Sequence, residues 1–168
     1  MNFSGFWDKP ENQRKFLDEV AIKLNVKEPK DWYNVKSKDI KKLGGFTLIH
    51  RYHGSMVDML LALYPEHNLK QWKFEKVSKG FWEKTENQFD FLETTAKVLL
   101  PRYLSNCYQE MELKELDDWY KVSFDKFVEM GGYPLLLLFN KSLPNILMNF
   151  YPNHNWKPWK FEKVPKGK

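Results

Sequence analysis

Residues 64–77, YPEHNLKQWKFEKV, return 87 residues further along the chain as residues 151–164, YPNHNWKPWKFEKV. Other identities keep this offset: DWY at 31–33 and 118–120, and Gly-Gly at 44–45 and 131–132. Nearer the start of each copy the offset is 75, which relates FW at 6–7 to FW at 81–82. The two offsets differ by 12, so the second copy carries a 12-residue insertion before Asp118. The sequence therefore predicts a tandem duplication, with repeats at residues 1–80 and 81–168.

Composition places the chain among globular proteins. Hydrophobic residues make up 42% of its 168 residues, aromatic residues 17% and charged residues 29%, which is enough apolar area for a core in each half. Cys107 is the single cysteine, so no disulfide within the chain is expected. No signal-peptide pattern opens the sequence, and the longest apolar cluster, residues 135–139, is too short to cross a bilayer. We expect an intracellular protein, nuclear or cytoplasmic, that is not secreted and does not enter a membrane.

Hydrophobic spacing predicts about four helices in each half. Residues 16, 17, 20, 21 and 24 form one apolar stripe of an amphipathic helix. Ser37, Ser55, Ser123 and Ser142 precede apolar segments and are predicted N-caps. The helices expected are 11–24, 38–43, 46–52 and 56–63 in the first half, and 86–100, 124–130, 134–139 and 143–150 in the second. A further helix at 109–116 and extended Trp-rich segments after residues 71 and 158, the first of them a connector, complete an all-α prediction.

The repeated tryptophans and histidines have structural and functional interpretations. Trp32, Trp72, Trp119 and Trp159 recur at matched positions. Exposed rings can stack on bases, but we expect all four to be buried core anchors. We interpret His67 and His154, one in each copy, as hydrogen-bonded structural ties.

Basic charge is concentrated in the first repeat and the tail. Residues 1–80 hold 15 Lys and Arg against 10 Asp and Glu, whereas residues 81–156 carry four more acidic than basic groups. A clustered basic surface attracts phosphate, although an ordinary solvated face is the alternative. The candidate nucleic-acid contacts are Lys36, Lys38, Lys41, Lys42, His50, Arg51, His53, Lys160, Lys163 and Lys166.

Catalytic and metal-binding patterns are missing from the sequence. It contains no phosphate-binding glycine loop, nucleophile elbow or HExxH motif. The histidines and the single cysteine do not fall at a recognised metal-ligand spacing. We therefore expect no enzymatic activity, no cofactor, no metal and no small-molecule substrate.

The order FW, helix, DWY, Gly-Gly, Ser-capped helix, YPxH and WKF resembles tandem tryptophan-rich helical repeats of some eukaryotic proteins. The part from Gly-Gly to the Ser-capped helix is also similar to helical repeats associated with homing endonucleases and to helicase-associated modules. That second resemblance implies contact with nucleic acid. The helix at 56–63 offers only Asp58 as a charged side chain, which argues against a base-reading recognition helix.

Two functions from different classes remain open. The first is a non-enzymatic accessory module that contacts the phosphate backbone of DNA or RNA through the first repeat. The second is a protein-interaction or scaffold module, because stacked helical repeats commonly form binding surfaces for larger assemblies.

Overall fold

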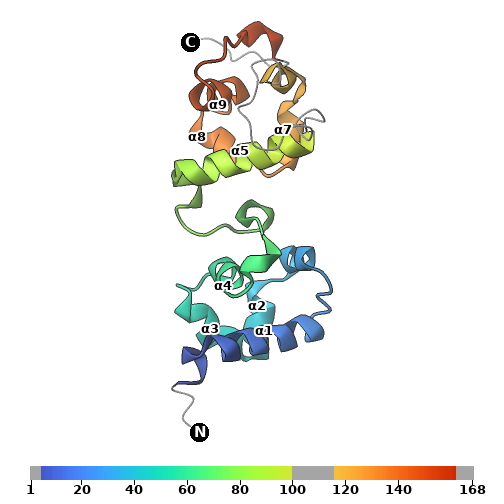
Figure 1. The fold of residues 1–168 in the computed structure, drawn as a ribbon, viewed down its shortest axis with the longest axis vertical. Coiled ribbons are helices and arrows are strands. Elements are labelled where there is room, and N and C mark those ends of the chain that lie inside the picture. Colours follow the sequence, from blue (N-terminus) through green and yellow to red (C-terminus); the bar gives the residue numbers. More distant parts are fainter. Residues whose placement is uncertain (1–4, 100–115, 162–168) are drawn as a thin grey trace. The chain divides into compact units, whose positions relative to one another are not determined.

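The computed structural model describes residues 5–99 and 116–161. The chain divides into two compact units, Met1–Lys79 and Gly80–Lys168. Within the described residues each unit contains four α-helices joined by short 3-10 helices, and no strand occurs (Figure 1). This confirms the all-α prediction. The predicted helix at 109–116 and the insertion lie almost entirely outside the described residues.

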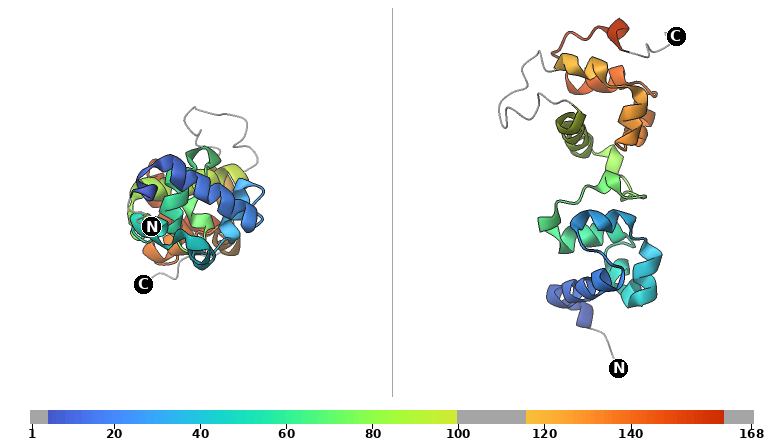
Figure 2. Two further views of the ribbon diagram at one scale, coloured as in Figure 1. Left: turned by 90° about the horizontal axis from the view of Figure 1, so that it is seen from below. Right: turned by 90° about the vertical axis from the view of Figure 1, so that its right-hand side faces the viewer.

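The first unit is built on α1 (Pro10–Lys23), which lies against α4 (Met56–Leu63) (Figure 2). Pro10 occupies the first helical position, where its missing N–H leaves no bond unmade. Between these helices come the 3-10 helix η2 (Pro29–Asn34), α2 (Ser37–Ile40), a π-helical turn η3 (Lys41–Gly45) and α3 (Phe46–Arg51). One buried side chain from each of several elements meets in the core: Leu17, Trp32, Ile40, Leu48 and Leu60.

The second unit has α5 (Thr85–Leu99), α7 (Phe124–Glu129), α8 (Tyr133–Leu138) and α9 (Leu143–Phe150). Trp119, in the 3-10 helix η8 (Asp117–Lys121), is fully buried. Phe91 of α5 and Phe127 of α7 meet edge to face, with ring centroids 5.5 Å apart. Such a contact stabilises the core beyond the area that the rings bury.

The same local contacts occur at matched positions in the two units. Gln13 Nε2 donates to the Trp7 carbonyl at 2.6 Å, and Gln88 Nε2 donates to the Trp82 carbonyl at 2.6 Å. The other pairs that match are Ser55 with Ser142 as N-caps, Tyr33–Phe74 with Tyr120–Phe161 as ring contacts, and Gly44 with Gly131 at positive φ.

Four predicted serine caps and one connector test the sequence predictions locally. Ser55, Ser123 and Ser142 accept hydrogen bonds from the backbone N–H three residues on, as predicted. Ser37 makes no cap, because it is already the first helical residue and Lys36 holds the N-cap position. The connector after residue 71 is not extended throughout: Gln71–Lys73 forms a 3-10 helix, and Phe74 is buried in the core of the first unit.

Three of the four repeated tryptophans are buried as predicted, but Trp159 is 72% exposed. The neighbouring Trp156 takes the interior position in the second unit. Its Nε1 donates to the Tyr151 carbonyl at 3.0 Å, and its ring contacts Tyr120. In the first unit the residue matched to Trp156 is Leu69, and there Trp72 stays buried. The larger ring of Trp156 occupies space that leaves Trp159 outside.

The two matched histidines are held in different ways. His154 Nε2 lies 2.9 Å from Asp117 Oδ1, which agrees with the predicted hydrogen-bonded tie. The His67 ring instead stacks on Tyr64, with centroids 4.6 Å apart and planes 7° from parallel. Its buried Nδ1 has no hydrogen-bond partner among the described residues, and its Nε2 lies 4.0 Å from Glu66 Oε1, so the predicted hydrogen-bonded tie does not form at Nδ1 of His67.

Candidate nucleic-acid interface

Residues 37–51 form a kinked helical segment that carries five of the ten predicted phosphate contacts. Two helical stretches meet at a kink at Gly44, whose φ of 100° is in the left-handed region that glycine adopts readily. Ile40, Leu48 and Ile49 are buried and anchor the segment to the core. Between them, Lys41, Lys42 and Phe46 are exposed, whereas Leu43 packs against the core.

Three lysines on this segment are exposed. Lys38, Lys41 and Lys42 follow the i, i+3, i+4 spacing that places side chains close together on a helix. None of them forms an ion pair with a residue that the structure describes. Their charges are thus available to a ligand.

Two other predicted contacts are already partly neutralised. Lys36 Nζ lies 3.9 Å from Glu75, and Arg51 donates to Asp8 at 2.7 Å. Both pairs are exposed, so each contributes little to stability. A nearby carboxylate nevertheless lowers the attraction of these two cations for phosphate.

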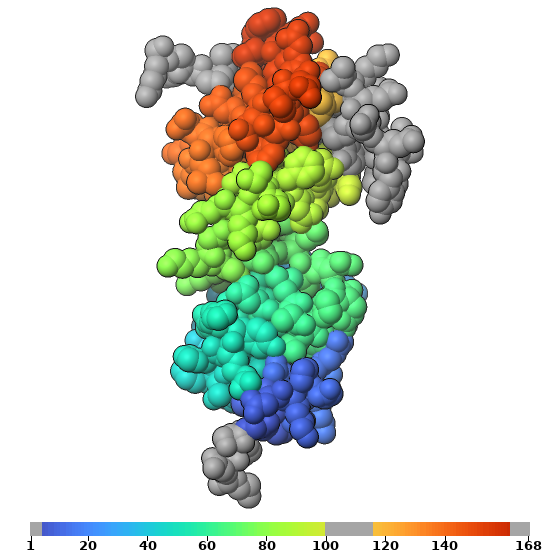
Figure 3. Space-filling view, turned by 60° about the vertical axis from the view of Figure 1, so that its left-hand side comes forward, coloured from blue at the N-terminus to red at the C-terminus, as the bar shows by residue number. Residues whose placement is uncertain are grey.

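An exposed aromatic ring lies among the lysines. Phe46, the first residue of α3, is 62% exposed. Lys41 Nζ is 5.7 Å from its ring centroid, and the His50 ring stacks on it with centroids 6.5 Å apart. We call Lys38, Lys41, Lys42, Phe46 and His50 the basic-aromatic face. The surface formed by residues near 45–55 is drawn in cyan in Figure 3.

Sequence analysis did not identify Phe46 as a functional residue. Its only distinguishing feature in the sequence is its position directly after Gly-Gly, two residues before the apolar pair Leu48 and Ile49. Phe46 lies three residues before the buried Ile49, so helical spacing alone does not place its ring outside the core. Burial of Phe46 would have been the default assumption for so large an apolar side chain.

The remaining predicted contacts do not join this face. His53 is exposed in the turn after α3, with a φ of 55°. Lys160 belongs to the second unit, where its Nζ lies 5.2 Å from the Tyr120 ring centroid. Lys163 and Lys166 lie outside the described residues.

The matched surface of the second unit has different chemistry. The helix α8 places Tyr133 where α3 has Phe46, and it has Leu137 and Leu138 in place of His50 and Arg51. These three side chains are 43%, 51% and 52% exposed. The second unit thus presents an apolar surface where the first presents a basic one.

A strongly basic residue of α1 is used inside the first unit. Arg14 donates to the Leu63 carbonyl at 3.0 Å, pairs with Glu66, and places its guanidinium 4.7 Å from the Tyr64 ring centroid. The hydrogen bond from Arg14 lowers the pKa of Glu66. Burial, aided by a hydrogen bond to Asp18, raises the pKa of Tyr64 well above its ordinary value. This network ties α1 to the end of α4.

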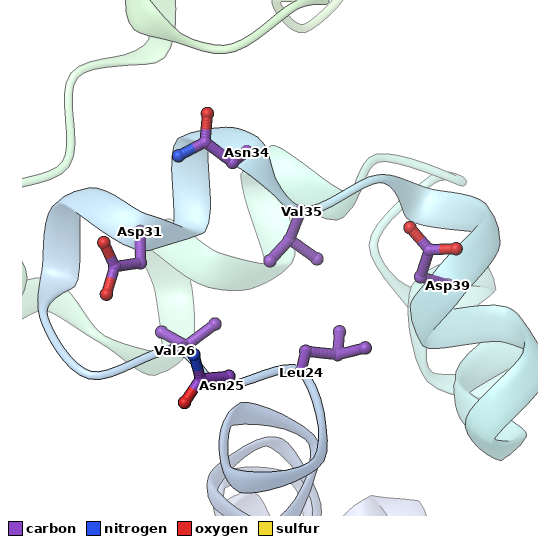
Figure 4. A pocket seen from close by; sticks show the side chains of 7 residues that line it. All are labelled: Leu24, Asn25, Val26, Asp31, Asn34, Val35 and Asp39. Atoms are coloured by element: carbon purple, nitrogen blue, oxygen red, sulfur yellow. The ribbon is translucent and has the colours of Figure 1, made fainter.

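A small pocket lies beside η2, and the Asp31 carboxylate that lines it already bonds the local backbone. It has a volume of about 280 Å³, and Asp31 and Asp39 lie at opposite ends of it (Figure 4). The Asp31 carboxylate accepts hydrogen bonds from the N–H groups of Lys27 and Glu28, both at 2.9 Å. These bonds, that from Glu28 most of all, lower the pKa of Asp31. The Asp31 carboxylate therefore stabilises the turn at residues 27–31.

A wider pocket of about 570 Å³ lies between α5 and α9 in the second unit. Phe89 and Phe150 line it, together with the carboxylates of Glu86, Asp90 and Glu93. No group of three or more metal-ligating side chains occurs within residues 5–99 and 116–161. Likewise, no helix in those ranges combines the length and apolar character that crossing a membrane requires.

Comparison with known proteins gives no family for this chain. No protein-family model matches it, and neither the curated proteins nor the solved structures compared with it include a match.

Proposed function

We propose that the chain consists of two copies of one helical module, and that the first copy binds nucleic acid without catalysing a reaction. The matched hydrogen bonds of Gln13 and Gln88, and the matched serine caps, support a common origin of the two units. This arrangement fits the resemblance to tandem tryptophan-rich repeats. A nucleic-acid ligand also fits action in the nucleus or cytoplasm.

The observation that carries the proposal is the group of lysines at 38, 41 and 42. Three exposed cations within five residues, none paired with a described carboxylate, create a concentrated positive potential. A phosphate backbone that meets them releases its condensed counterions, which is the main source of sequence-independent affinity. The first unit as a whole supports this, with five more basic than acidic groups in residues 1–80.

The ligand is held by its backbone more than by its base edges. The capped helix α4 carries Asp58 as its one charged side chain, and most of its residues are buried. Direct reading of base edges needs polar side chains such as Arg, Asn or Gln in a groove. We therefore propose an accessory module that adds nucleic-acid affinity to a larger assembly. Sequence-specific recognition would come from other components of that assembly.

A protein ligand is the second candidate, and a specific observation on the second unit favours it. Tyr133, Leu137 and Leu138 form an exposed apolar surface on α8. Apolar side chains that gather at one place on a surface are typical of sites that bind other proteins. The two functions are compatible, because they use different units.

Charge reversal tests the nucleic-acid proposal. Fluorescence anisotropy with labelled DNA and RNA should detect binding at low salt by the wild-type protein. Changing Lys38, Lys41 and Lys42 together to Glu should abolish it, because each lost phosphate contact removes its share of counterion release. Circular dichroism should show an unchanged fold, since exposed positions tolerate such changes.

A matched control separates the local surface from net charge. Lys15, Lys23 and Lys27 are also exposed but lie on α1 and the turn after it. Changing these three to Glu alters the net charge by the same amount. The control variant should keep most of the affinity. Equal loss in both triple variants, or no binding by the wild-type protein at low salt, would contradict the proposed interface.

A further inference from the structure

We infer that the basic-aromatic face selects single-stranded nucleic acid, with one unpaired base stacked on Phe46. The inference rests on the proposed function, and it names the class of ligand that this surface takes. Its starting point is the Phe46 ring, which is 62% exposed in a unit whose other described large apolar side chains are mostly buried or partly buried.

The Phe46 ring is presented on a rigid support. It opens α3, whose next turn is anchored by the buried Leu48 and Ile49. The residue before it, Gly45, is buried, and a Cβ atom there would lie 2.6 Å from Ile40 Cγ2. Close packing on both sides fixes the backbone at residue 46. A ring on a fixed backbone loses little freedom when a flat ligand stacks on it.

Basic side chains lie beside the Phe46 ring and just before it in the chain. Lys41 Nζ lies 5.7 Å from the ring centroid and His50 stacks beside it, while Lys38 and Lys42 lie on the preceding turns. A base on the ring would therefore have its phosphates next to positive groups. Aromatic platforms combined with cations that follow the backbone are the usual means of binding single strands with little sequence preference.

A duplex would use this surface less completely. Its bases are paired and stacked on one another, so their faces are closed to Phe46, and only the lysines would make contact with phosphates. Lys41 lies over the ring in the free protein, but its flexible four-carbon side chain can swing aside to meet a phosphate. The structure thus favours an unpaired strand.

The second unit offers a natural comparison. Tyr133 is an exposed aromatic residue at the matched position, but Leu137 and Leu138 stand where the first unit has His50 and Arg51. A stacked base there would find no neighbouring cation on α8. Tyr133→Ala is therefore the matched control for Phe46→Ala.

The test uses the full chain and three labelled probes of about 12 nucleotides or base pairs, which is within the site sizes seen for single-strand modules. The probes are an oligothymidine, an abasic strand with the same sugar-phosphate backbone, and a duplex. The oligothymidine should bind about tenfold more tightly than the abasic strand, which corresponds to one stacked base. Phe46→Ala should reduce oligothymidine affinity to the abasic level and leave duplex binding unchanged. Tyr133→Ala should have no effect.

Conservative variants separate stacking from simple apolar contact. Phe46→Trp should keep or increase the preference for the oligothymidine, whereas Phe46→Leu should lose it as fully as the alanine variant does. Unchanged melting of each variant would show that it folds, as expected for an exposed position.

Each failure has its own meaning. Equal affinity for the oligothymidine and the abasic strand, or an oligothymidine affinity that Phe46→Ala does not change, would overturn the single-strand inference and leave phosphate binding standing. Failure of the wild-type protein to bind any of the three probes at low salt would overturn the proposed function as well.

Discussion

Replacing Gly45 with alanine tests the packing that presents the basic-aromatic face. A Cβ atom on Gly45 would lie 2.6 Å from Ile40 Cγ2, 3.0 Å from the Ile40 carbonyl oxygen and 3.1 Å from Phe16 Cε1. Non-bonded carbon atoms prefer a separation of about 3.5–4.0 Å. The side-chain atoms can shift, but the carbonyl belongs to the helical turn and moves only with the backbone. The added methyl group therefore overpacks the site.

Two opposing effects set the change in the free energy of unfolding that Gly45→Ala causes. Overpacking costs about 1–3 kcal/mol, and contact with a backbone oxygen places this site in the upper half of that range. Gly45 has a φ of −81°, which alanine adopts without strain, so the substitution regains about 0.4–1 kcal/mol by restricting the unfolded chain. The net loss should be about 1–2.6 kcal/mol. For a unit of this size the melting temperature should fall by about 4–8 °C per kcal/mol.

Urea denaturation followed by circular dichroism measures this loss, and a double-mutant cycle assigns it. Phe16→Leu removes the ring atom nearest the new methyl group. It should therefore destabilise the Gly45→Ala protein less than it destabilises the wild type, because contacting sites couple. A Gly45→Ala protein as stable as the wild type, or more stable, would show an open site and refute this packing around Phe46.

Further substitutions test other parts of the fold. Trp119→Ala should cost about 3–5 kcal/mol of stability, as for large core truncations, whereas Trp159→Ala should change stability by less than about 0.5 kcal/mol because the ring is exposed. Ser55→Ala should cost about 1 kcal/mol by removing an N-cap. The pKa of Asp31 is depressed in the folded state, so its contribution to stability is present above its unfolded pKa and is lost as pH falls through the folded value. Asp31→Asn should flatten the acid side of the stability–pH curve. Urea melts measure all four, and equal costs for the two tryptophans would contradict the burial described above.

Features that depend on nearby residues could be predicted from the sequence. The helices at Met56–Leu63 and Leu143–Phe150 begin and end where expected, because a serine cap and a Tyr-Pro pair act within one turn. Ser37 shows the limit of such local rules. It stands before an apolar pattern, yet the helix begins one residue earlier than a cap at Ser37 requires.

Choices between competing side chains could not be predicted. Trp156 and Trp159 are three residues apart, and local sequence does not say which ring enters the core. Only the fit against Tyr120 and the Tyr151 carbonyl decides it. The candidate interface has the same limitation. The six basic residues predicted near it could be identified from the sequence. The ion pair of Arg51 with Asp8 could not, because it joins residues 43 apart in sequence. The exposure of Phe46 follows from the tertiary packing of α3.

The salt dependence of binding tests the central claim most directly. Affinity of the wild-type protein for a labelled oligothymidine should be measured by anisotropy at salt concentrations from about 50 mM to about 200 mM. Three lysine–phosphate contacts predict a slope of log affinity against log salt of about −2, at about 0.7 per contact for a single strand. The same slope should persist when Lys15, Lys23 and Lys27 are changed to Glu, and binding should be lost when Lys38, Lys41 and Lys42 are changed. Binding that is absent at the lowest salt, or that keeps its slope in the latter variant, would contradict the account.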